Sequence, residues 1–390
     1  MTLIEFYDST AIHNVLSALL LAPARLILVG ADEEDLRKDA GRISRLLKAR
    51  GMETDIETFC LSDKTYDGIY KAVEKIVMKH SDCVMELVGG DALIMTVLGA
   101  ISEKYGIPMH TADPTTMSIS PFTKKEVYPP ISPVSLSVNE LISLYGGLIT
   151  QSTAPPISNK PFWQDVLSVW AVCRKNSGDF NSAVSAFHSL CPPESIHPYL
   201  SVQKLTGSLS PQKAEKVLAL LEGLNENGAI LAFKKTKKDI SFRYKSRAVQ
   251  EALHKEGSVL EFYTYFAALS DFGQGSAFSD GKIGVEIEWD DAKDNLKNEI
   301  DVMLMDGITP IFISCKNGYV GTEELYKLSV VADRFGGPYA KKAIVMTKQK
   351  ADISFLARAR ELGISVISDV QEMPLAGFSK YLKRTLKNKT

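Results

Sequence analysis

The chain has 390 residues, of which 45% are hydrophobic and 24% are charged, and its formal net charge is −2. This composition is ordinary for a globular protein of two or three domains. It excludes a chain that binds a polyanion through bulk positive charge, so any such affinity requires a local basic surface or a metal ion.

The sequence shows no membrane, export or disulfide signal. No run of about eighteen apolar residues occurs, so we expect no transmembrane helix. The first residues lack the basic and apolar zones of a signal peptide, which favours a cytoplasmic location. The five cysteines, at positions 60, 83, 173, 191 and 315, are scattered and odd in number, which predicts buried thiols rather than disulfides or a zinc site.

Strand and helix patterns alternate over residues 1–150. The expected strands span residues 3–7, 25–30, 53–59, 83–88 and 109–111, and the expected helices span residues 11–21, 33–50, 66–79 and 92–105. This alternation predicts an α/β domain of the Rossmann type, with a mostly parallel sheet and helices on both faces.

Two loops at the carboxyl ends of these strands are candidate ligand-binding loops, because ligands of such sheets bind there. Ser9 and Thr10 follow the first strand, and Gly89, Gly90 and Asp91 follow the fourth. The glycines permit close approach of the backbone to a ligand, and a helix N-terminus favours phosphate. Alternatively, the hydroxyl and carboxylate groups only cap the helices that follow. The chain has no Gly-x-Gly-x-x-Gly and no Walker sequence, which disfavours a dinucleotide or nucleoside triphosphate.

Residues 151–256 are expected to link two domains. A segment rich in Pro, Ser and Thr leads into a pair of helices, after which helix, hairpin and helix patterns over residues 210–254 resemble a winged-helix module. The tip of the hairpin carries Lys234, Lys235, Lys237 and Lys238. These lysines are candidates for contacts to phosphates, although a solvated hairpin tip is the alternative.

Residues 257–390 are expected to form the last domain. The expected helices span residues 258–269, 323–335 and 353–362. The expected strands are, in chain order, residues 282–289, two strands within residues 298–316, and residues 343–347 and 365–368. The order helix, three strands, helix, strand, helix, strand is that of the restriction-endonuclease-like α/β core.

The second and third of these strands form a hairpin joined at Asp306-Gly307, a dipeptide that favours a tight turn. A turn symmetric about this dipeptide places Asp301 opposite Phe312 and Glu299 opposite Ser314. Acidic residues and Lys316 then share one face of a hairpin whose other face is apolar.

The acidic residues and the lysine on this face of the hairpin predict a metal-dependent nuclease. Such enzymes hold magnesium or manganese with carboxylates, and a lysine orients the attacking water. Asp301 and Lys316 have the usual positions, whereas the second acid expected two residues before the lysine is Ser314. Glu299 or Glu261 is therefore expected to complete the ligand set. The alternatives are that Glu261 belongs to a Ser-x-x-Glu capping box and that Glu299 is a solvated strand residue.

Four short motifs carry a resemblance to a known family. They are Gly257-Ser-Val-Leu-Glu261, Asn298-Glu-Ile-Asp-Val302, Phe312-Ile-Ser-Cys-Lys316 and Phe335-Gly-Gly337. Together with the N-terminal topology and the loop at residues 89–91, they make the chain resemble the CARF-domain nucleases of type III CRISPR systems. Members of that family join a ligand-sensing CARF domain to a PD-(D/E)xK nuclease domain.

The resemblance implies a homodimer whose two CARF domains form one pocket for a cyclic oligoadenylate, most often cyclic tetra-adenylate. This activator is expected to rearrange the nuclease domains, which then use manganese or magnesium to cut single-stranded DNA or RNA, or to nick duplex DNA. A twofold interface suits a symmetric ligand because each half reads identical groups. Carried over to this sequence, the metal ligands are Asp301, Glu299 and Glu261, the water-orienting lysine is Lys316, and the activator pocket contains Ser9, Thr10, Gly89, Gly90 and Asp91.

Two other functions remain compatible with the sequence. The first is a ligand-controlled transcription regulator of the CARF type, in which the winged-helix-like segment binds DNA and the last domain is a degenerate nuclease. The basic tip and Ser314 favour it, and the pairing of Asp301 with Lys316 opposes it. The second is a repair or restriction nuclease that needs no activator.

Overall fold

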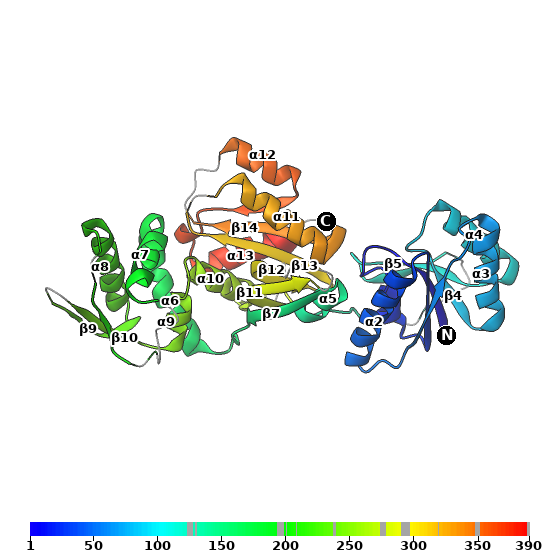
Figure 1. Cartoon of the computed structure of the whole chain (residues 1–390), viewed down its shortest axis with the longest axis horizontal. Coiled ribbons are helices and arrows are strands. Elements are labelled where there is room, and N and C mark those ends of the chain that lie inside the picture. Colours follow the sequence, from blue (N-terminus) through cyan, green and yellow to red (C-terminus); the bar gives the residue numbers. More distant parts are fainter. Residues whose placement is uncertain are drawn as a thin grey trace.

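The computed structural model describes residues 1–122, 128, 131–192, 199, 201–207, 209–236, 239–273, 278–289, 297–318, 320–347 and 352–387. The chain forms three bodies in a row, with the N-terminal domain at one end and the helical linker at the other (Figure 1). The C-terminal domain lies between them, so the spatial order differs from the order in the sequence. Within the described residues, no helix is long and apolar enough to cross a membrane.

The N-terminal domain has a twisted sheet with the strand order β3-β2-β1-β4-β5-β6, in which only β6 is antiparallel to its neighbour. Its strands are β1 (Thr2–Phe6), β2 (Arg25–Gly30), β3 (Asp55–Cys60), β4 (Cys83–Glu86), β5 (Met109–Asp113) and β6 (Ser118–Pro121). Its helices are α1 (Leu16–Leu21), α2 (Glu33–Ala49), α3 (Tyr66–Lys79) and α4 (Ala92–Tyr105). Helices α1 and α2 cover one face and α3 and α4 the other, which confirms the α/β prediction.

The linker contains α6 (Lys160–Lys175), α7 (Ser177–Leu190), β8 (Gln203–Leu205), α8 (Pro211–Glu226), β9 (Ile230–Lys235), β10 (Ile240–Tyr244) and α9 (Arg247–Ala252). Its strands form a small antiparallel sheet in the order β8-β10-β9. Helix α6 packs on the C-terminal domain through aromatic stacking, with ring centroids 4.5 Å apart for Trp163 and Phe266 and 4.2 Å apart for Trp170 and Tyr263. Stacked aromatic pairs of this kind add to the free energy of apolar burial, so the linker and the last domain share one core.

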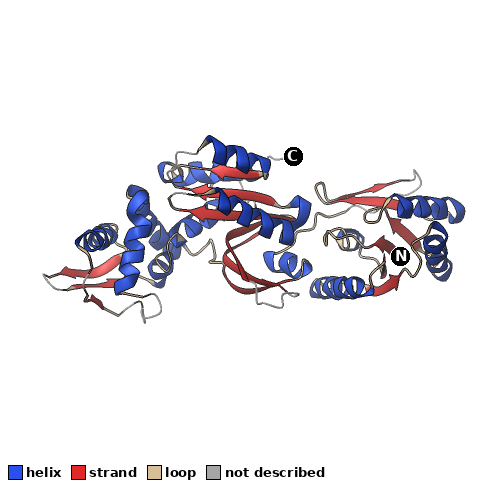
Figure 2. Ribbon diagram, turned by 45° about the horizontal axis from the view of Figure 1, so that its top comes forward, coloured by secondary structure: helices blue, strands red, loops and turns tan. Residues whose placement is uncertain are grey.

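The C-terminal domain has a mixed sheet with the order β15-β14-β13-β12-β11-β7. Its strands are red in the middle of the molecule, with helices against them (Figure 2). Its elements after the linker are α10 (Ser258–Leu269), β11 (Asp280–Trp289), β12 (Lys297–Asp306), β13 (Thr309–Lys316), α11 (Thr322–Gly336), the 3-10 helix η2 (Gly337–Tyr339), β14 (Lys341–Met346), α12 (Ile353–Glu361), β15 (Ile364–Ile367), η3 (Val370–Glu372) and α13 (Leu375–Lys387). Helices α10 and α13 cover one face of the sheet, and α11 and α12 cover the other. The expected order of helices and strands is present, with α13 as an addition at the end.

The expected domain boundary at residue 150 falls inside strand β7 (Gly147–Thr153). This strand pairs with β11, and α5 (Val138–Leu144) precedes it, so the C-terminal sheet begins before the linker in the chain. Gly147 makes the packing possible, because a Cβ there would lie 2.7 Å from the ring of Phe335. The strand is mostly exposed along its length, so its sequence lacks the apolar pattern from which strands are predicted.

The register of the β12–β13 hairpin differs by two residues from the expected one. Met303 pairs with Phe312 and Val302 with Ile313, which places Asp301 level with Ser314. The turn is formed by Gly307 and Ile308, with Gly307 at φ 65°. A shift of two residues keeps every side chain on its predicted face. The expected grouping of the charged residues on one face is therefore kept, although their partners change.

Candidate active site

The strands β12 and β13 separate beyond the pair Val302–Ile313. From there β12 continues along β11 as far as Lys297, whereas β13 continues along β14 as far as Lys316. The separation opens a groove of about 470 Å³, whose lining includes Asp301, Ser314 and Lys316. Polar groups in the middle of a sheet can thus reach a ligand.

The carboxylate of Asp301 is held by three donors. Its Oδ2 atom accepts hydrogen bonds from the backbone N–H of Cys315 (2.7 Å) and from the hydroxyl of Ser314 (3.2 Å). The ammonium of Lys316 lies 3.4 Å from the same oxygen. Ser314, which stands where an acid was expected, therefore orients Asp301. The arrangement fixes one carboxylate oxygen and leaves the other available for a ligand.

Lys316 lies between two carboxylates. Its Nζ atom is 3.4 Å from Asp301 Oδ2 and 3.3 Å from Glu324 Oε2, which belongs to the first turn of α11. Burial lowers the pKa of Lys316, but Asp301 and Glu324 outweigh burial and raise the pKa above its ordinary value. The lysine is therefore held as a cation in the groove.

Glu261 on α10 is a buried acid that faces Asp301, with 4% of its surface exposed. Burial, followed by the charge of Asp301, raises the pKa of Glu261 to about 8, and Lys255 opposes the shift. The predicted capping box does not form, since the residue before the helix is Gly257 and no side chain caps it. Glu261 is thus directed into the site by its position on α10.

Lys255 joins the remaining acids. Its ammonium forms ion pairs with Glu299 and, at 3.8 Å, with Glu261. Burial lowers the pKa of Lys255, but Glu261 and Glu299 outweigh burial, so the pKa lies above its ordinary value. Glu299 remains 46% exposed at its side chain, so it is accessible from solvent.

The acids form an oxygen-rich set of the kind that magnesium and manganese prefer. As the side chains stand, no group of three or more His, Cys, Asp or Glu residues in the described part of the chain is arranged to hold a metal ion. These acids nevertheless suit a bound cation, because the ammonium of Lys255 already forms ion pairs with both Glu261 and Glu299. Asp301 and Glu299 also contribute, after burial, to the raised pKa of Glu261, so a cation at this position would lower that pKa.

Sequence reasoning missed Lys255 and Glu324. Lys255 lies in the short segment between α9 and α10. Glu324 is one of two acids in the first turn of α11, where acids are common because they stabilise the helix dipole. A lysine between two helices and a glutamate in the first turn of a helix are common, so neither indicates a functional site. The fold brings Lys255 and Glu324 close to Asp301 and Lys316.

The candidate ligand loops of the N-terminal domain lie side by side, since β1 and β4 are neighbours. A Cβ at Gly89, which has φ 84°, would lie 2.2 Å from the carbonyl oxygen of Phe6, so only glycine fits there. Asp91 caps α4 by accepting from the N–H groups of Leu93 and Ile94, as the alternative interpretation expected. Gly90 also has a positive φ, of 85°.

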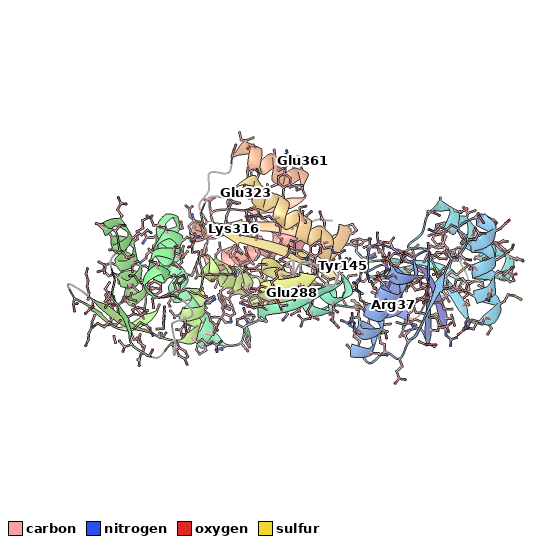
Figure 3. All side chains as sticks on the ribbon, viewed as in Figure 1. Arg37, Tyr145, Glu288, Lys316, Glu323 and Glu361 are labelled. Atoms are coloured by element: carbon pink, nitrogen blue, oxygen red, sulfur yellow. The ribbon has the colours of Figure 1, made fainter. Side chains whose placement is uncertain are left out.

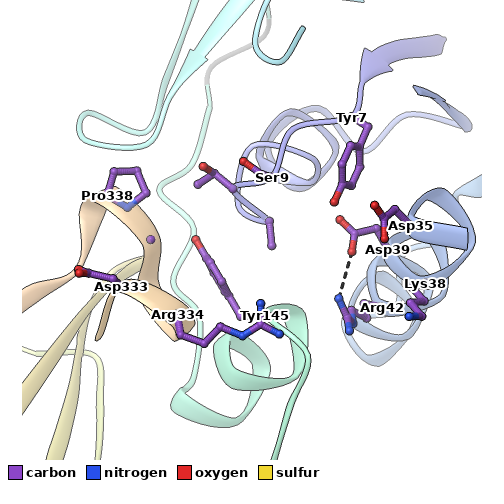
Figure 4. A pocket seen from close by; sticks show the side chains of 13 residues that line it. Tyr7, Ser9, Asp35, Lys38, Asp39, Arg42, Tyr145, Asp333, Arg334 and Pro338 are labelled. Carbon is purple, nitrogen blue, oxygen red and sulfur yellow. Dashed lines mark hydrogen bonds and ion pairs between the residues drawn. The ribbon is translucent and has the colours of Figure 1, made fainter. Parts of the chain in front are cut away.

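Ser9 and Thr10 line a cavity of about 460 Å³ between the N-terminal and C-terminal domains (Figure 4). Other lining residues come from α2, from Tyr145 after α5 and from the end of α11. Charged groups of both signs face the cavity, among them Asp39 and Arg42, which pair at 3.2 Å. Gly89, Gly90 and Asp91 are not among the lining residues.

The basic hairpin of the linker lies at the end of the molecule that is far from the N-terminal domain (Figure 1). Lys234 and Lys235 are exposed there, and Lys235 lies 3.5 Å from Glu222. Lys237 and Lys238 lie outside the described residues.

Comparisons with known proteins agree with this geometry. Residues 249–384 match the family model described as Card1-like, endonuclease domain. No curated protein sequence matches the chain.

Three solved structures share the fold. Protein VC1899 from Vibrio cholerae has a TM-score of 0.76 at 14% identity, covering 99% of this chain and 98% of the other. Can2 from Sulfobacillus thermosulfidooxidans, solved with cyclic tetra-adenylate, has a TM-score of 0.65 at 15% identity, covering 98% and 97%. A type III CRISPR defence DNA nuclease activated by cyclic oligoadenylate has a TM-score of 0.51 at 12% identity, covering all of this chain and 52% of the other.

Proposed function

We propose that this chain, which carries a Card1-like endonuclease domain over residues 249–384, is a metal-dependent nuclease activated by cyclic oligoadenylate in type III CRISPR defence. The proposed enzyme is a cytoplasmic homodimer that cuts single-stranded DNA or RNA, or nicks duplex DNA. The observation that carries the proposal is the pair of Asp301 and Lys316, held 3.4 Å apart where β12 and β13 separate inside the matched domain.

The activator is proposed from the N-terminal domain. The Can2 structure that shares the fold along nearly the whole chain contains cyclic tetra-adenylate. In this chain the loops after β1 and β4 meet at the carboxyl edge of the sheet, where backbone N–H groups and helix N-termini favour phosphates. We assign Ser9, Thr10, Gly89, Gly90 and Asp91 to the activator pocket, which a second copy of the domain would complete.

In the nuclease domain, Asp301, Glu299 and Glu261 would hold magnesium or manganese. Such an ion polarises the scissile phosphate and lowers the pKa of bound water. Lys316, kept charged beside Asp301, is placed to orient a water molecule or to stabilise negative charge on the phosphate. Ser314 keeps the carboxylate of Asp301 oriented through its hydroxyl. Lys255 contacts the Oε1 atoms of Glu299 and Glu261, so its ammonium would share these two carboxylates with the metal ion.

Cleavage assays on labelled single-stranded DNA and RNA test this function. With manganese and cyclic tetra-adenylate, the wild-type protein should degrade at least one of the two substrates, and Asp301→Ala should abolish this. Glu361→Gln is a control, since Glu361 is an exposed acid of the same domain that pairs with Arg358 on α12. Unchanged cleavage by Asp301→Ala would refute the site.

A ligand-controlled transcription regulator is the second candidate function. The exposed Lys234 and Lys235 on the winged-helix-like hairpin favour it, as does Ser314 in place of an acid. Specific binding to duplex DNA with no strand cleavage under any metal would decide for this candidate. Cleavage at full rate without cyclic oligoadenylate would instead indicate a nuclease that needs no activator.

A further inference from the structure

Helix α11 touches both functional regions of the molecule. Its first turn contributes Glu324 to the candidate active site, and η2, which follows its last residue directly, contacts the N-terminal domain through Tyr339 and His13. Figure 3 shows the two ends: Glu323 lies toward Lys316, and Tyr145 lies at the opposite side of the C-terminal domain, next to the N-terminal one. The helix has 15 residues, which corresponds to a length of about 22 Å.

At the first turn, Glu324 is held by two lysines. Its Oε2 atom lies 3.3 Å from Lys316 Nζ, and its Oε1 atom lies 2.8 Å from Lys327 Nζ. Lys316 is also 3.4 Å from Asp301, so its ammonium sits between a carboxylate of the sheet and a carboxylate of the helix. Asp301 is fixed by the backbone of β13. The position of Lys316 therefore depends on where α11 places Glu324.

At the other end, the helix terminates against the N-terminal domain. The hydroxyl of Tyr145 donates to the carbonyl oxygen of Gly336 at 3.4 Å. A Cβ at Gly337 would lie 3.2 Å from the same hydroxyl and 3.4 Å from Thr10 Cγ2, so the backbone is tightly packed here. His13 Nε2 and the hydroxyl of Tyr339 are 2.8 Å apart, with the rings edge to face at a centroid distance of 5.6 Å.

His13 is tied to the loop after β1. Its Nδ1 atom lies 3.3 Å from Asp8 Oδ1, and this oxygen accepts the backbone N–H of Thr10 at 2.7 Å. Asp8 therefore joins the candidate activator loop to His13, and His13 joins it to Tyr339. Two contacts therefore connect the loop to η2, which follows α11: the 3.3 Å approach of His13 Nδ1 to Asp8 and the 2.8 Å hydrogen bond between His13 Nε2 and Tyr339.

Helix α11 packs on the sheet through one face only. Leu325, Leu328, Ala332 and Phe335 bury one face of the helix against the sheet, and its outer face is largely exposed. Packed helices shift as rigid bodies by about 1–2 Å in allosteric transitions. A shift of this size at Glu324 is enough to make or break its 3.3 Å contact with Lys316.

We propose that Glu324 is a positioning residue for Lys316 and that α11 transmits the state of the loop at residues 8–13 to it. This proposal rests on the proposed function and adds to it the route from the activator to the catalytic lysine. It assigns roles to Glu324, His13 and Tyr339.

The first test measures steady-state cleavage by Glu324→Gln, with Glu323→Gln as the matched control from the same helical turn. Loss of the charge should lower kcat ~10- to 100-fold with KM within about twofold, because a misplaced lysine affects the reacting phosphate rather than binding. Glu323→Gln should stay within about twofold of wild type. Glu324→Asp should recover part of kcat. Equal kcat values for Glu324→Gln and Glu323→Gln would refute the positioning role.

The second test measures cleavage as a function of cyclic tetra-adenylate for Tyr339→Phe, with Tyr66→Phe as the control, because Tyr66 is an exposed residue of α3. Removal of the Tyr339 hydroxyl should leave cleavage without activator unchanged and reduce the maximal activation by about fivefold, the equivalent of one hydrogen bond. Activator binding measured by calorimetry should persist. Wild-type activation in Tyr339→Phe would refute the route. A wild-type protein that cyclic tetra-adenylate does not activate would refute the proposed function itself, so the two failures are distinguishable.

Discussion

The acids of the C-terminal hairpin and the acids of the N-terminal sheet show how differently one fold class uses buried carboxylates. Glu5 on β1 and Glu86 on β4 are fully buried on the same face of adjacent strands. Burial, followed by the charge of Glu86, raises the pKa of Glu5 well above its ordinary value. Asp301 and Glu261, in contrast, are accompanied by Lys316 and Lys255. Lys255 opposes the rise that burial causes in the pKa of Glu261, whereas in the buried pair of Glu5 and Glu86 the second carboxylate adds to the rise in the pKa of Glu5.

The two candidate sites also differ in the chemical groups that form them. The proposed nuclease site consists of charged side chains that the fold of one chain brings together. The proposed activator loops contain glycines, hydroxyls and one helix cap, and in the proposal they bind the ligand through backbone groups and together with a second copy of the domain. Variants in one site should therefore leave the other intact.

The largest expected effect is that of Lys316→Gln. Loss of the ammonium beside Asp301 should reduce cleavage by ~10²–10³-fold, because a preorganised charge at the reacting phosphate is lost. Calorimetry should give an unchanged affinity for cyclic tetra-adenylate. A parallel loss of both properties would show that the two sites are not separate.

The corresponding variant in the candidate activator loop is Gly89→Ala. Residue 89 has a positive φ, and the added Cβ would clash with the carbonyl oxygen of Phe6. We expect a destabilisation of about 1–3 kcal/mol and an activator affinity lowered at least ~10-fold. Cleavage without activator should not change. Gly99→Ala is the control, since a Cβ there meets no atom within 4 Å. Equal activator affinities of the two variants would contradict the pocket assignment.

A smaller effect is expected for Ser314→Ala, which removes the hydroxyl that donates to Asp301 at 3.2 Å. Loss of this bond should cost about 1 kcal/mol, or about fivefold in kcat. If activity instead falls as far as in Asp301→Ala, Ser314 has a direct catalytic role.

The smallest effect concerns stability and pH. The folded state of the wild-type protein retains a proton on Glu5 above the pKa of the unfolded chain, so its stability falls as pH rises above that value. Glu5→Gln should remove this loss and raise the melting temperature at pH 8 by about 2–4 °C, with no difference near pH 4. Differential scanning calorimetry at several pH values measures both. A lower melting temperature of the variant at pH 8 would mean that the Glu5 carboxylate is stabilised in the fold.

Much of this architecture could be predicted from the sequence, because its strands are short apolar runs between amphipathic helices. The grouping of Asp301, Glu299 and Lys316 on one face also followed from alternation, and it survived the two-residue register difference because a shift of two preserves the face. The match of residues 249–384 to an endonuclease model confirms that this hairpin belongs to a nuclease domain.

Other features depend on contacts between distant segments. Strand β7 is an exposed edge strand without an apolar pattern, so nothing in its sequence assigns it to the last domain. Lys255 and Glu324 are ordinary charged residues near helix starts until the fold brings them to the site. The register of the hairpin depended on whether Asp306 or Ile308 accompanies Gly307 in the turn, which the dipeptide alone does not decide.

The most direct measurement is cleavage of labelled single-stranded DNA by the wild-type protein in manganese, as a function of cyclic tetra-adenylate concentration. Cyclic hexa-adenylate and a sample with EDTA are run in parallel. We expect negligible cleavage without activator, saturating activation by the tetra-adenylate and complete loss of cleavage in EDTA. Equal cleavage with and without either cyclic oligoadenylate, or cleavage that survives EDTA, would contradict it.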